Sequence, residues 1–136
     1  MSSTTFRFAL LAFGAYALAA QSPQPGAPAG GTETVISTFR VRAGKEAEFA
    51  RVHAQAWPAY RRFGVVAEKP HLVLQGVDEA GKTYFVEIFT WKDHDAPDHA
   101  SPEIRAIWAQ LEALCEPRLG HRGIEFPEVQ IVRAEK

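Results

Sequence analysis

Apolar residues recur along this chain at two spacings, one typical of strands and the other of helices. Between Thr83 and Trp91 nearly every residue is aromatic or β-branched, which favours a central β-strand. After a polar segment, Ser101 and Pro102 are suited to cap and begin a helix. The apolar residues that follow recur every three or four positions and form one stripe: Ile104, Ile107, Trp108, Leu111, Leu114 and Cys115.

A strand and a helix are also predicted nearer the N-terminus. Thr34 to Arg42 is rich in β-branched residues, and Lys45 to Phe63 carries apolar residues at helical spacing. Pro58 lies inside this second pattern and removes a backbone donor. We therefore expect it to kink or divide the helix after Ala56.

A hairpin and a last strand complete the pattern. His71 to Val77 predicts a short strand, and the turn residues Asp78 to Gly81 connect it to the strand Tyr84–Trp91. A last strand is expected from Glu128 to Ala134. The order β-α-β-β-α-β predicts an α+β, ferredoxin-like fold, with a four-stranded antiparallel sheet and both helices on one face.

The N-terminal residues have the composition of an export signal. Phe8 to Ala20 is an uninterrupted run of apolar and small residues, preceded by Arg7. We predict a signal peptide at residues 1–20, a flexible Pro/Gly-rich linker at 21–33 and one folded domain at 34–136. Cleavage would leave an exported protein, periplasmic or secreted, with no attachment to a membrane. An uncleaved N-terminal anchor is the alternative.

Charge and cysteine content narrow the function classes. The formal net charge is −1, which argues against nucleic acid as a partner. Cys115 is the only cysteine, so the chain forms neither an internal disulfide nor a multi-cysteine metal site. Its place on the apolar stripe predicts a small buried hydrophobic residue.

Alternation along the strands sorts the side chains onto two faces of the predicted sheet. The third strand divides into Tyr84, Val86 and Ile88 on one face and Phe85, Glu87, Phe89 and Trp91 on the other. The aliphatic face suits packing against helices. The second face is mixed, because it also receives Arg40, His71 and Gln75 from neighbouring strands.

We expect a second copy of the chain to cover the mixed face and to enclose a partly polar cavity, which predicts a homodimer. The alternative is that Arg40 and Glu87 form an ordinary ion pair on an exposed face.

Three segments resemble the dimeric α/β-barrel superfamily and, more narrowly, its antibiotic biosynthesis monooxygenase (ABM)-like domains. They are RAGKEAEF at 42–49, the strand end FTW at 89–91 and the helix start ASPEIRAIW at 100–108. The resemblance implies a homodimer with a cavity between helices and sheet. Some members oxidise activated phenols or anthrones with O2 and need neither metal nor flavin.

Haem-degrading members of the superfamily use a Trp in the linker and an axial His on the helix that follows. In this chain Asp98 and His99 occupy the linker position, and Trp108 lies at or next to the helix position. The resemblance therefore does not imply haem degradation, and we expect no cofactor.

His71 and Glu87 are the predicted catalytic pair. Near neutral pH a histidine can abstract a proton from an acidic phenol, and Glu87 would orient the ring. The residues expected to bind an aromatic substrate in the same cavity are Arg40, His53, Trp57, Gln75, Phe85, Phe89 and Trp91. Two alternatives stay open: His71 as a satisfied polar residue on a strand, and His53 as a core histidine bonded to a backbone carbonyl.

The polar linker before Ser101 contains His94 and His99 among three aspartates. Two imidazoles and a carboxylate can bind Zn or Fe. The five-residue spacing fits neither an i,i+4 helical pair nor a familiar ligand motif, so we expect a solvated linker and no metal site.

Two functions remain open from the sequence. The first is an exported ABM-like domain that binds a small aromatic or quinone-like molecule and acts as a cofactor-independent monooxygenase. The second is a non-catalytic ligand-binding or stress-associated dimeric barrel.

Overall fold

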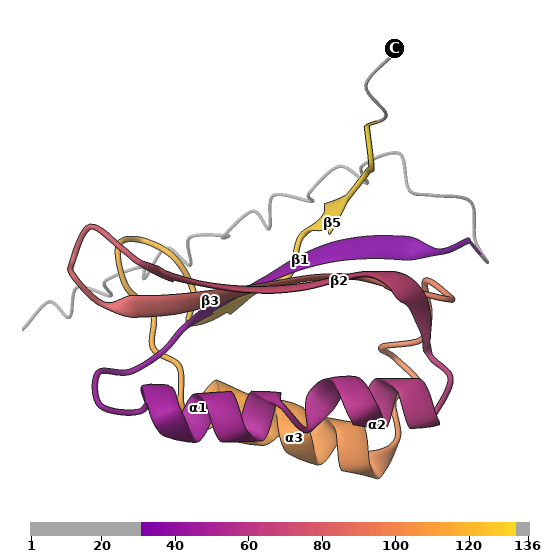
Figure 1. Ribbon diagram of the computed structural model, residues 1–136, viewed down its shortest axis with the longest axis horizontal. Coiled ribbons are helices and arrows are strands. Elements are labelled where there is room, and N and C mark those ends of the chain that lie inside the picture. Colours follow the sequence, from indigo (N-terminus) through magenta and orange to yellow (C-terminus); the bar gives the residue numbers. More distant parts are fainter. Residues whose placement is uncertain (1–30, 133–136) are drawn as a thin grey trace, which may run out of the picture.

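The computed structural model describes residues 31–132, which form a sheet with all helices packed on one side (Figure 1). The elements in chain order are β1 (Glu33–Arg40), α1 (Glu46–His53), α2 (Ala56–Arg62), β2 (Val66–Val77), β3 (Thr83–Trp91), α3 (Pro102–Ala113), β4 (Ile124–Glu125) and β5 (Glu128–Val129). The sheet is antiparallel, with strand order β2-β3-β1-β4, and β5 also pairs with β1. The predicted ferredoxin-like α+β fold is confirmed.

The predicted signal peptide and most of the predicted linker lie outside the described residues. Strand β1 begins at Glu33, one residue before the predicted start of the domain. Within residues 31–132, no helix is both long enough and apolar enough to cross a membrane.

The first helix is divided as predicted, but its first part ends three residues earlier, at His53 and not at Ala56. Helix α1 ends at His53 and α2 begins at Ala56, so Pro58 is the third residue of a new helix. In the first turn of a helix the backbone N–H has no intrahelical partner, and a proline there costs little. The chain therefore breaks before Pro58 and avoids a kink within a helix.

Strand β2 is longer than predicted because it begins at Val66 and not at His71. Its pairing with β3 shifts register between these two residues, and the Lys69–Pro70 peptide bond within the shift is cis. Proline is tolerated in a strand at a sheet edge or a bulge, and β2 is an edge strand. Residues 66–70 were not predicted as strand because Pro70 interrupts the strand pattern of the sequence.

The last strand predicted from Glu128 to Ala134 begins at Glu128 as β5 but ends at Val129, and its residues 133–134 lie outside the described part of the chain. Two short strands, β4 and β5, pair with β1 on either side of Pro127, whose carbonyl accepts a hydrogen bond from the Ile36 N–H at 3.2 Å. Pro127 has no N–H to donate, so it interrupts the ladder. The place of the predicted fourth strand, beside β1, is therefore taken by two short strands, β4 and β5.

Helix α3 and its cap match the prediction. The Ser101 hydroxyl accepts a hydrogen bond from the Ile104 N–H at 3.2 Å, and Pro102 is the first helical residue. The stripe faces the sheet, with Trp108 half-buried and the other members buried. Burial raises the pKa of the Cys115 thiol to about 11, so the cysteine behaves as the predicted small hydrophobic residue.

The helices cover the face that carries Glu87 and the aromatic residues, so the predicted orientation of β2 and β3 was wrong. Phe85 of β3 stacks on Phe49 of α1, with ring centroids 4.8 Å apart. Phe39 of β1 pairs with Phe85 and lies on the same, helix-covered face, as predicted for β1. The helices present aromatic and histidine side chains to the sheet. These side chains pack against the aromatic residues of the mixed face and bond to Glu87, which an aliphatic face could not offer.

The aliphatic set lies on the open face of the sheet, away from the helices. Its members are Ile36, Leu72, Leu74, Val86 and Ile88, which are neighbours in the strand register. Leu72 and Leu74 are each 52% exposed. A contiguous apolar surface of this kind is typical of a contact with another protein.

Replacing Leu111 with alanine tests the core between α3 and the sheet. Leu111 is 2% exposed, so we expect Leu111→Ala to lower the free energy of unfolding by about 2–5 kcal/mol. Chemical denaturation measures this, and Gln110→Ala at an exposed neighbouring position is the matched control. Equal stability of the two variants would contradict the packing of α3 on the sheet.

Candidate active site

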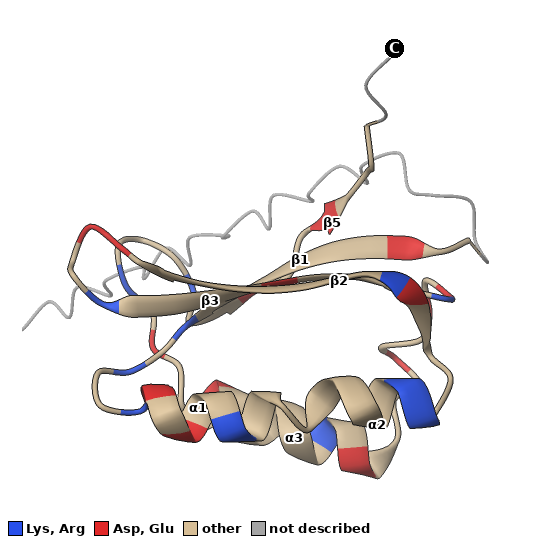
Figure 2. Ribbon diagram, viewed as in Figure 1, with Lys and Arg blue, Asp and Glu red and all other residues tan. Residues whose placement is uncertain are grey.

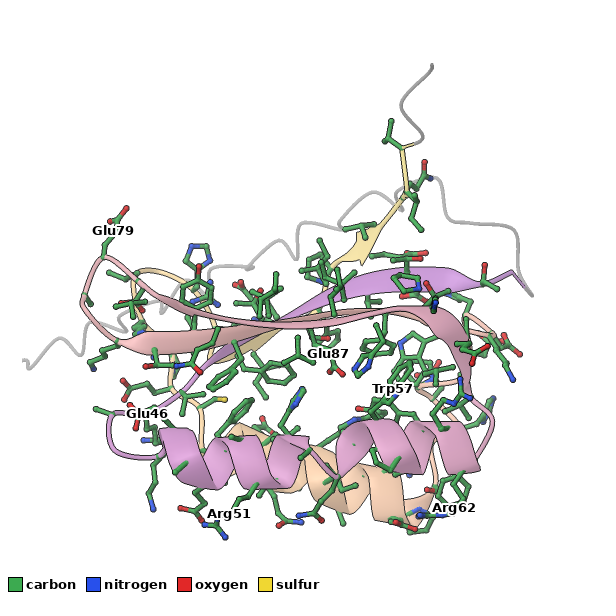
Figure 3. All side chains as sticks on the ribbon, viewed as in Figure 1. Glu46, Arg51, Trp57, Arg62, Glu79 and Glu87 are labelled. Atoms are coloured by element: carbon green, nitrogen blue, oxygen red, sulfur yellow. The ribbon has the colours of Figure 1, made fainter. Side chains whose placement is uncertain are left out.

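Glu87 is the one buried carboxylate among residues 31–132, with 2% of its surface exposed. It lies in the middle of β3, and Figure 3 shows it directed from the sheet toward the helices. Its Oε2 is 3.1 Å from Nε2 of His53, and its Oε1 is 3.0 Å from Nε2 of His71. Each carboxylate oxygen therefore has its own imidazole partner.

His53 comes from the last turn of α1 and is buried. Phe49, one turn earlier on the same face of the helix, stacks on the His53 ring with centroids 5.5 Å apart. Phe39 of β1 meets the ring edge-on at 5.4 Å. Packing on two sides and the contact with Glu87 hold this imidazole in one orientation.

His71 comes from the edge strand β2 and is partly open to solvent, with 25% of its side chain exposed. Trp57 of α2 lies flat against it, with ring centroids 3.7 Å apart and an interplanar angle of 6°. His71 pairs in register with Phe89 of β3, and its ring reaches Glu87 on the helix-covered face of the sheet. His71 is thus the more accessible of the two histidines.

The positions of the imidazole protons depend on the charge of Glu87. In its ionised form the carboxylate only accepts hydrogen bonds, and both histidines then donate to it through Nε2–H. A neutral ring that carries its proton on Nε2 has a lone pair on Nδ1, which can take up a proton. In this tautomer the Nδ1 of His71 has the chemistry of a general base, and the hydrogen bond to Glu87 stabilises the tautomer.

A groove of about 440 Å³ opens beside this cluster, between the helices and the edge of the sheet. The helices contribute Phe49, His53 and Trp57 to its lining, and the strands contribute His71, Val73 and Phe85. Most of this surface is apolar, and its volume is in the range of small-molecule sites. The groove thus suits a flat apolar ligand that reaches a pair of imidazoles.

The structure brings together five of the nine residues predicted for the site: His53, Trp57, His71, Phe85 and Glu87. Phe89 and Trp91 face the same side but pack into the core. Their rings lie 5.6 and 5.2 Å from Tyr60. Tyr60 itself accepts a hydrogen bond from Trp108 Nε1 at 2.6 Å, and burial raises its pKa.

Arg40 and Gln75 lie outside the groove. Arg40 is on the open face, where it donates hydrogen bonds to Glu125 at 3.0 Å and to the carbonyl of Arg122 at 2.9 Å. The Arg40–Glu87 ion pair, which was the alternative interpretation of these two residues, is therefore not formed. Gln75 pairs in register with Phe85 and is exposed on the edge strand.

Sequence reasoning missed Phe49 and Val73 as lining residues. Phe49, His53 and Trp57 are spaced four residues apart, which places them along one side of consecutive helical turns. That spacing was the available signal for Phe49. Val73 follows His71 by two residues and therefore lies on the same face of β2, and this alternation was the available signal for it.

His94 takes part in a cluster that the linker pattern did not indicate. Its Nδ1 lies 2.7 Å from Glu33 Oε2 and 3.8 Å from Glu128 Oε1, and the three ligand atoms lie within 4.8 Å of one another. Burial, followed by the nearby charge of Glu128, raises the pKa of Glu33. The group joins three segments distant in sequence, and His99 is not a member of it.

Solved structures of known proteins share this architecture. SnoaB, a cofactor-independent oxygenase from Streptomyces nogalater, matches as a variant at a TM-score of 0.56 and 24% identity, over 76% of this chain and 95% of the other. The fold is that of the ABM-like proteins.

Two further structures extend the comparison to less similar chains. A proposed antibiotic biosynthesis monooxygenase from Bordetella bronchiseptica matches at a TM-score of 0.55 and 19% identity, over 76% and 99% of the two chains. A dimeric ferredoxin-like protein of unknown function from Jannaschia matches at 0.52 and 16%, over 74% and 100%. No family model matches the sequence, and no curated protein does. At these identities the comparisons establish the ABM-like fold.

Replacing Glu87 by glutamine tests the hydrogen-bond assignment. Nitrogen NMR of labelled imidazoles is expected to show the Nε2–H tautomer for both His53 and His71 at a pH where the rings are neutral. In Glu87→Gln the amide offers one acceptor and one donor, so one ring must move its proton to Nδ1. An Nδ1–H tautomer on either ring of the unmodified protein would contradict the assignment.

Proposed function

We propose that this protein is a cofactor-independent monooxygenase that oxidises a small aromatic or quinone-like molecule with O2. The observation that carries the proposal is the His71–Glu87 pair at the border of an apolar groove. The ABM-like fold and its similarity to the oxygenase SnoaB support it. The chain's own residues supply a base, a group that orients the base, and a site of low polarity.

The first step is removal of a proton from the substrate. His71 Nδ1 takes the proton from an activated phenol or from the methylene carbon of an anthrone, and its Nε2–H stays bonded to Glu87. The positive charge formed on the ring is stabilised by the adjacent carboxylate. The substrate becomes an electron-rich anion, and the apolar wall of Phe49, Val73 and Phe85 keeps competing water away from it.

The second step joins this anion to O2. The substrate carbon gives up electrons to O2 and forms a carbon–oxygen bond, which gives a peroxide. His71 returns its proton as the oxygen–oxygen bond breaks, and the hydrogen that remains on the oxidised carbon is lost as a proton. The products are a ketone and one molecule of water, so the substrate is the only reductant that the reaction needs.

His53 has a supporting role in this proposal. It is a mostly buried part of the groove's lining and is bonded to the second oxygen of Glu87, so it helps to keep the carboxylate turned toward His71. A buried carboxylate with one unoccupied oxygen would also pay the cost of desolvation for that oxygen. We therefore assign His53 as a positioning residue.

We also propose that two copies associate through the open face of the sheet. That face is aliphatic, and Leu72 and Leu74 on the edge strand are half exposed. The Jannaschia protein of the same fold is described as dimeric. This surface replaces the aromatic face from which the sequence predicted the dimer, because the helices of the same chain cover that face.

Export to the periplasm or the exterior is part of the proposal. It rests on the apolar run from Phe8 to Ala20 and on the small residues at the end of that run, which have the composition of a cleavable signal.

Non-catalytic binding of the same class of ligand is the second candidate. The observation in its favour is that both imidazoles are already engaged, His53 by aromatic packing and His71 by its stack on Trp57. In that case the groove would bind an aromatic molecule and the histidines would only stabilise Glu87.

Oxygen uptake with anthrone and hydroquinone distinguishes the two candidates. If the chain is an oxygenase, we expect His71→Ala to lower the rate about 100-fold or more and Glu87→Gln to lower it as well. His99→Ala, at an exposed position outside the groove, serves as the control and should leave the rate unchanged. If there is no oxygen uptake, or if both variants turn over as fast as the unmodified protein, the oxygenase proposal is contradicted and non-catalytic binding is the remaining candidate.

The dimer is tested by placing a charge on the open face. We expect the purified protein to be a dimer at micromolar concentration and Leu74→Lys to be a monomer, because a lysine cannot be buried there without a partner. Light scattering after size exclusion measures both. Gln110→Lys on the outer side of α3 is the control, and a monomeric unmodified protein would contradict this use of the open face.

A further inference from the structure

A second hollow of about 920 Å³ continues from the groove along the edge strand β2. Trp57 and His71 border both hollows, so the two are neighbours separated by this stacked pair. Figure 3 shows the order along the space between sheet and helices, from Glu87 through Trp57 toward Arg62 at the end of α2. We call the first the inner groove and the second the outer hollow.

The two compartments differ in charge. The inner groove is mostly apolar, whereas Arg61 and Lys69 line the outer hollow from opposite sides. Arg61 follows Trp57 by four residues on α2 and therefore lies on the same side of the helix. Figure 2 shows basic segments at the C-terminal end of α2 and on the part of β2 that faces it.

The acidic residue in the outer hollow does not bind Arg61 closely. Glu68 Oε1 is 3.9 Å from Arg61 Nη2, beyond hydrogen-bond distance, and the Glu68 side chain is 79% exposed. An exposed pair at this separation contributes little energy. The guanidinium of Arg61 is therefore able to bind a carboxylate, which it can contact through two parallel hydrogen bonds.

We propose that the ligand is an aromatic carboxylic acid, with its rings in the inner groove and its carboxylate in the outer hollow between Arg61 and Lys69. The inference rests on the proposed function, because it takes the inner groove as the site of the aromatic part. The stacked rings of Trp57 and His71 form the wall past which the ligand extends. His71 then lies beside the phenol or anthrone ring of the ligand, from which it removes the proton.

Glu68 has a defined part in this arrangement. Its carboxylate repels an anionic ligand and competes with it for Arg61, so it weakens binding of the acid. A neutral aromatic molecule in the inner groove does not meet this charge. Removal of the Glu68 charge should thus strengthen binding of the acid and leave the neutral compound unaffected.

The experiment compares two ligands that differ by one carboxylate, naphthol and hydroxynaphthoic acid, in titration calorimetry with the full chain. We expect the acid to bind at least tenfold more tightly than naphthol to the unmodified protein. In the double variant Arg61→Gln, Lys69→Gln this advantage should disappear, with the Kd for naphthol unchanged. In Glu68→Gln the acid should bind several-fold more tightly.

Arg51→Gln, on the exposed side of α1 and outside both hollows, is the matched control for loss of a positive charge. It should leave the preference for the acid intact. All three positions of the test variants line a solvent-exposed hollow, so each variant is expected to fold as the unmodified chain does.

Two results would overturn the inference while leaving the aromatic groove in place. They are equal affinities of naphthol and the acid for the unmodified protein, and a loss in the double variant that affects both ligands alike. Failure of both ligands to bind the unmodified protein would instead contradict the inner groove itself, and with it the proposed function.

Discussion

Glu87 is buried beneath the helices, and two histidines from different parts of the chain are its partners. A carboxylate removed from water loses several kcal/mol of hydration, and only well-placed charged or polar partners offset that loss. His53 at the end of α1 and His71 on the edge strand supply one hydrogen bond to each oxygen. This contact therefore requires that β2, β3 and α1 take their observed positions together.

The same contact explains the form of the groove. Helix α1 ends at His53, whose imidazole reaches the sheet, and after two intervening residues α2 begins and brings Trp57 against β2. The break between the helices and the irregular start of β2 lie on the same edge of the fold. A space remains there that is apolar on most of its surface and open at the stack of Trp57 on His71.

The predictions that held are those that rest on interactions between residues close in sequence. Ser101 and Pro102 begin α3 through contacts within four residues, and Asp78 accepts hydrogen bonds from Ala80 and Lys82 in the hairpin turn. The predictions that failed depend on contacts between distant segments. Pro70 is accommodated in β2 because that strand lies at the edge, and the end of the sheet is divided because two short segments share β1.

By itself, the sequence determined the order of the main elements, the N-cap of α3 and the presence of a polar residue among aromatic ones in β3, since each follows from local periodicity and local hydrogen bonding. It also identified five of the residues that meet at the site. Only the tertiary structure decided which face of the sheet the helices cover. Alternation divides a strand into two faces without naming the buried one, and the choice depended on Phe49, His53 and Trp57, which reach the sheet from helices far away in sequence.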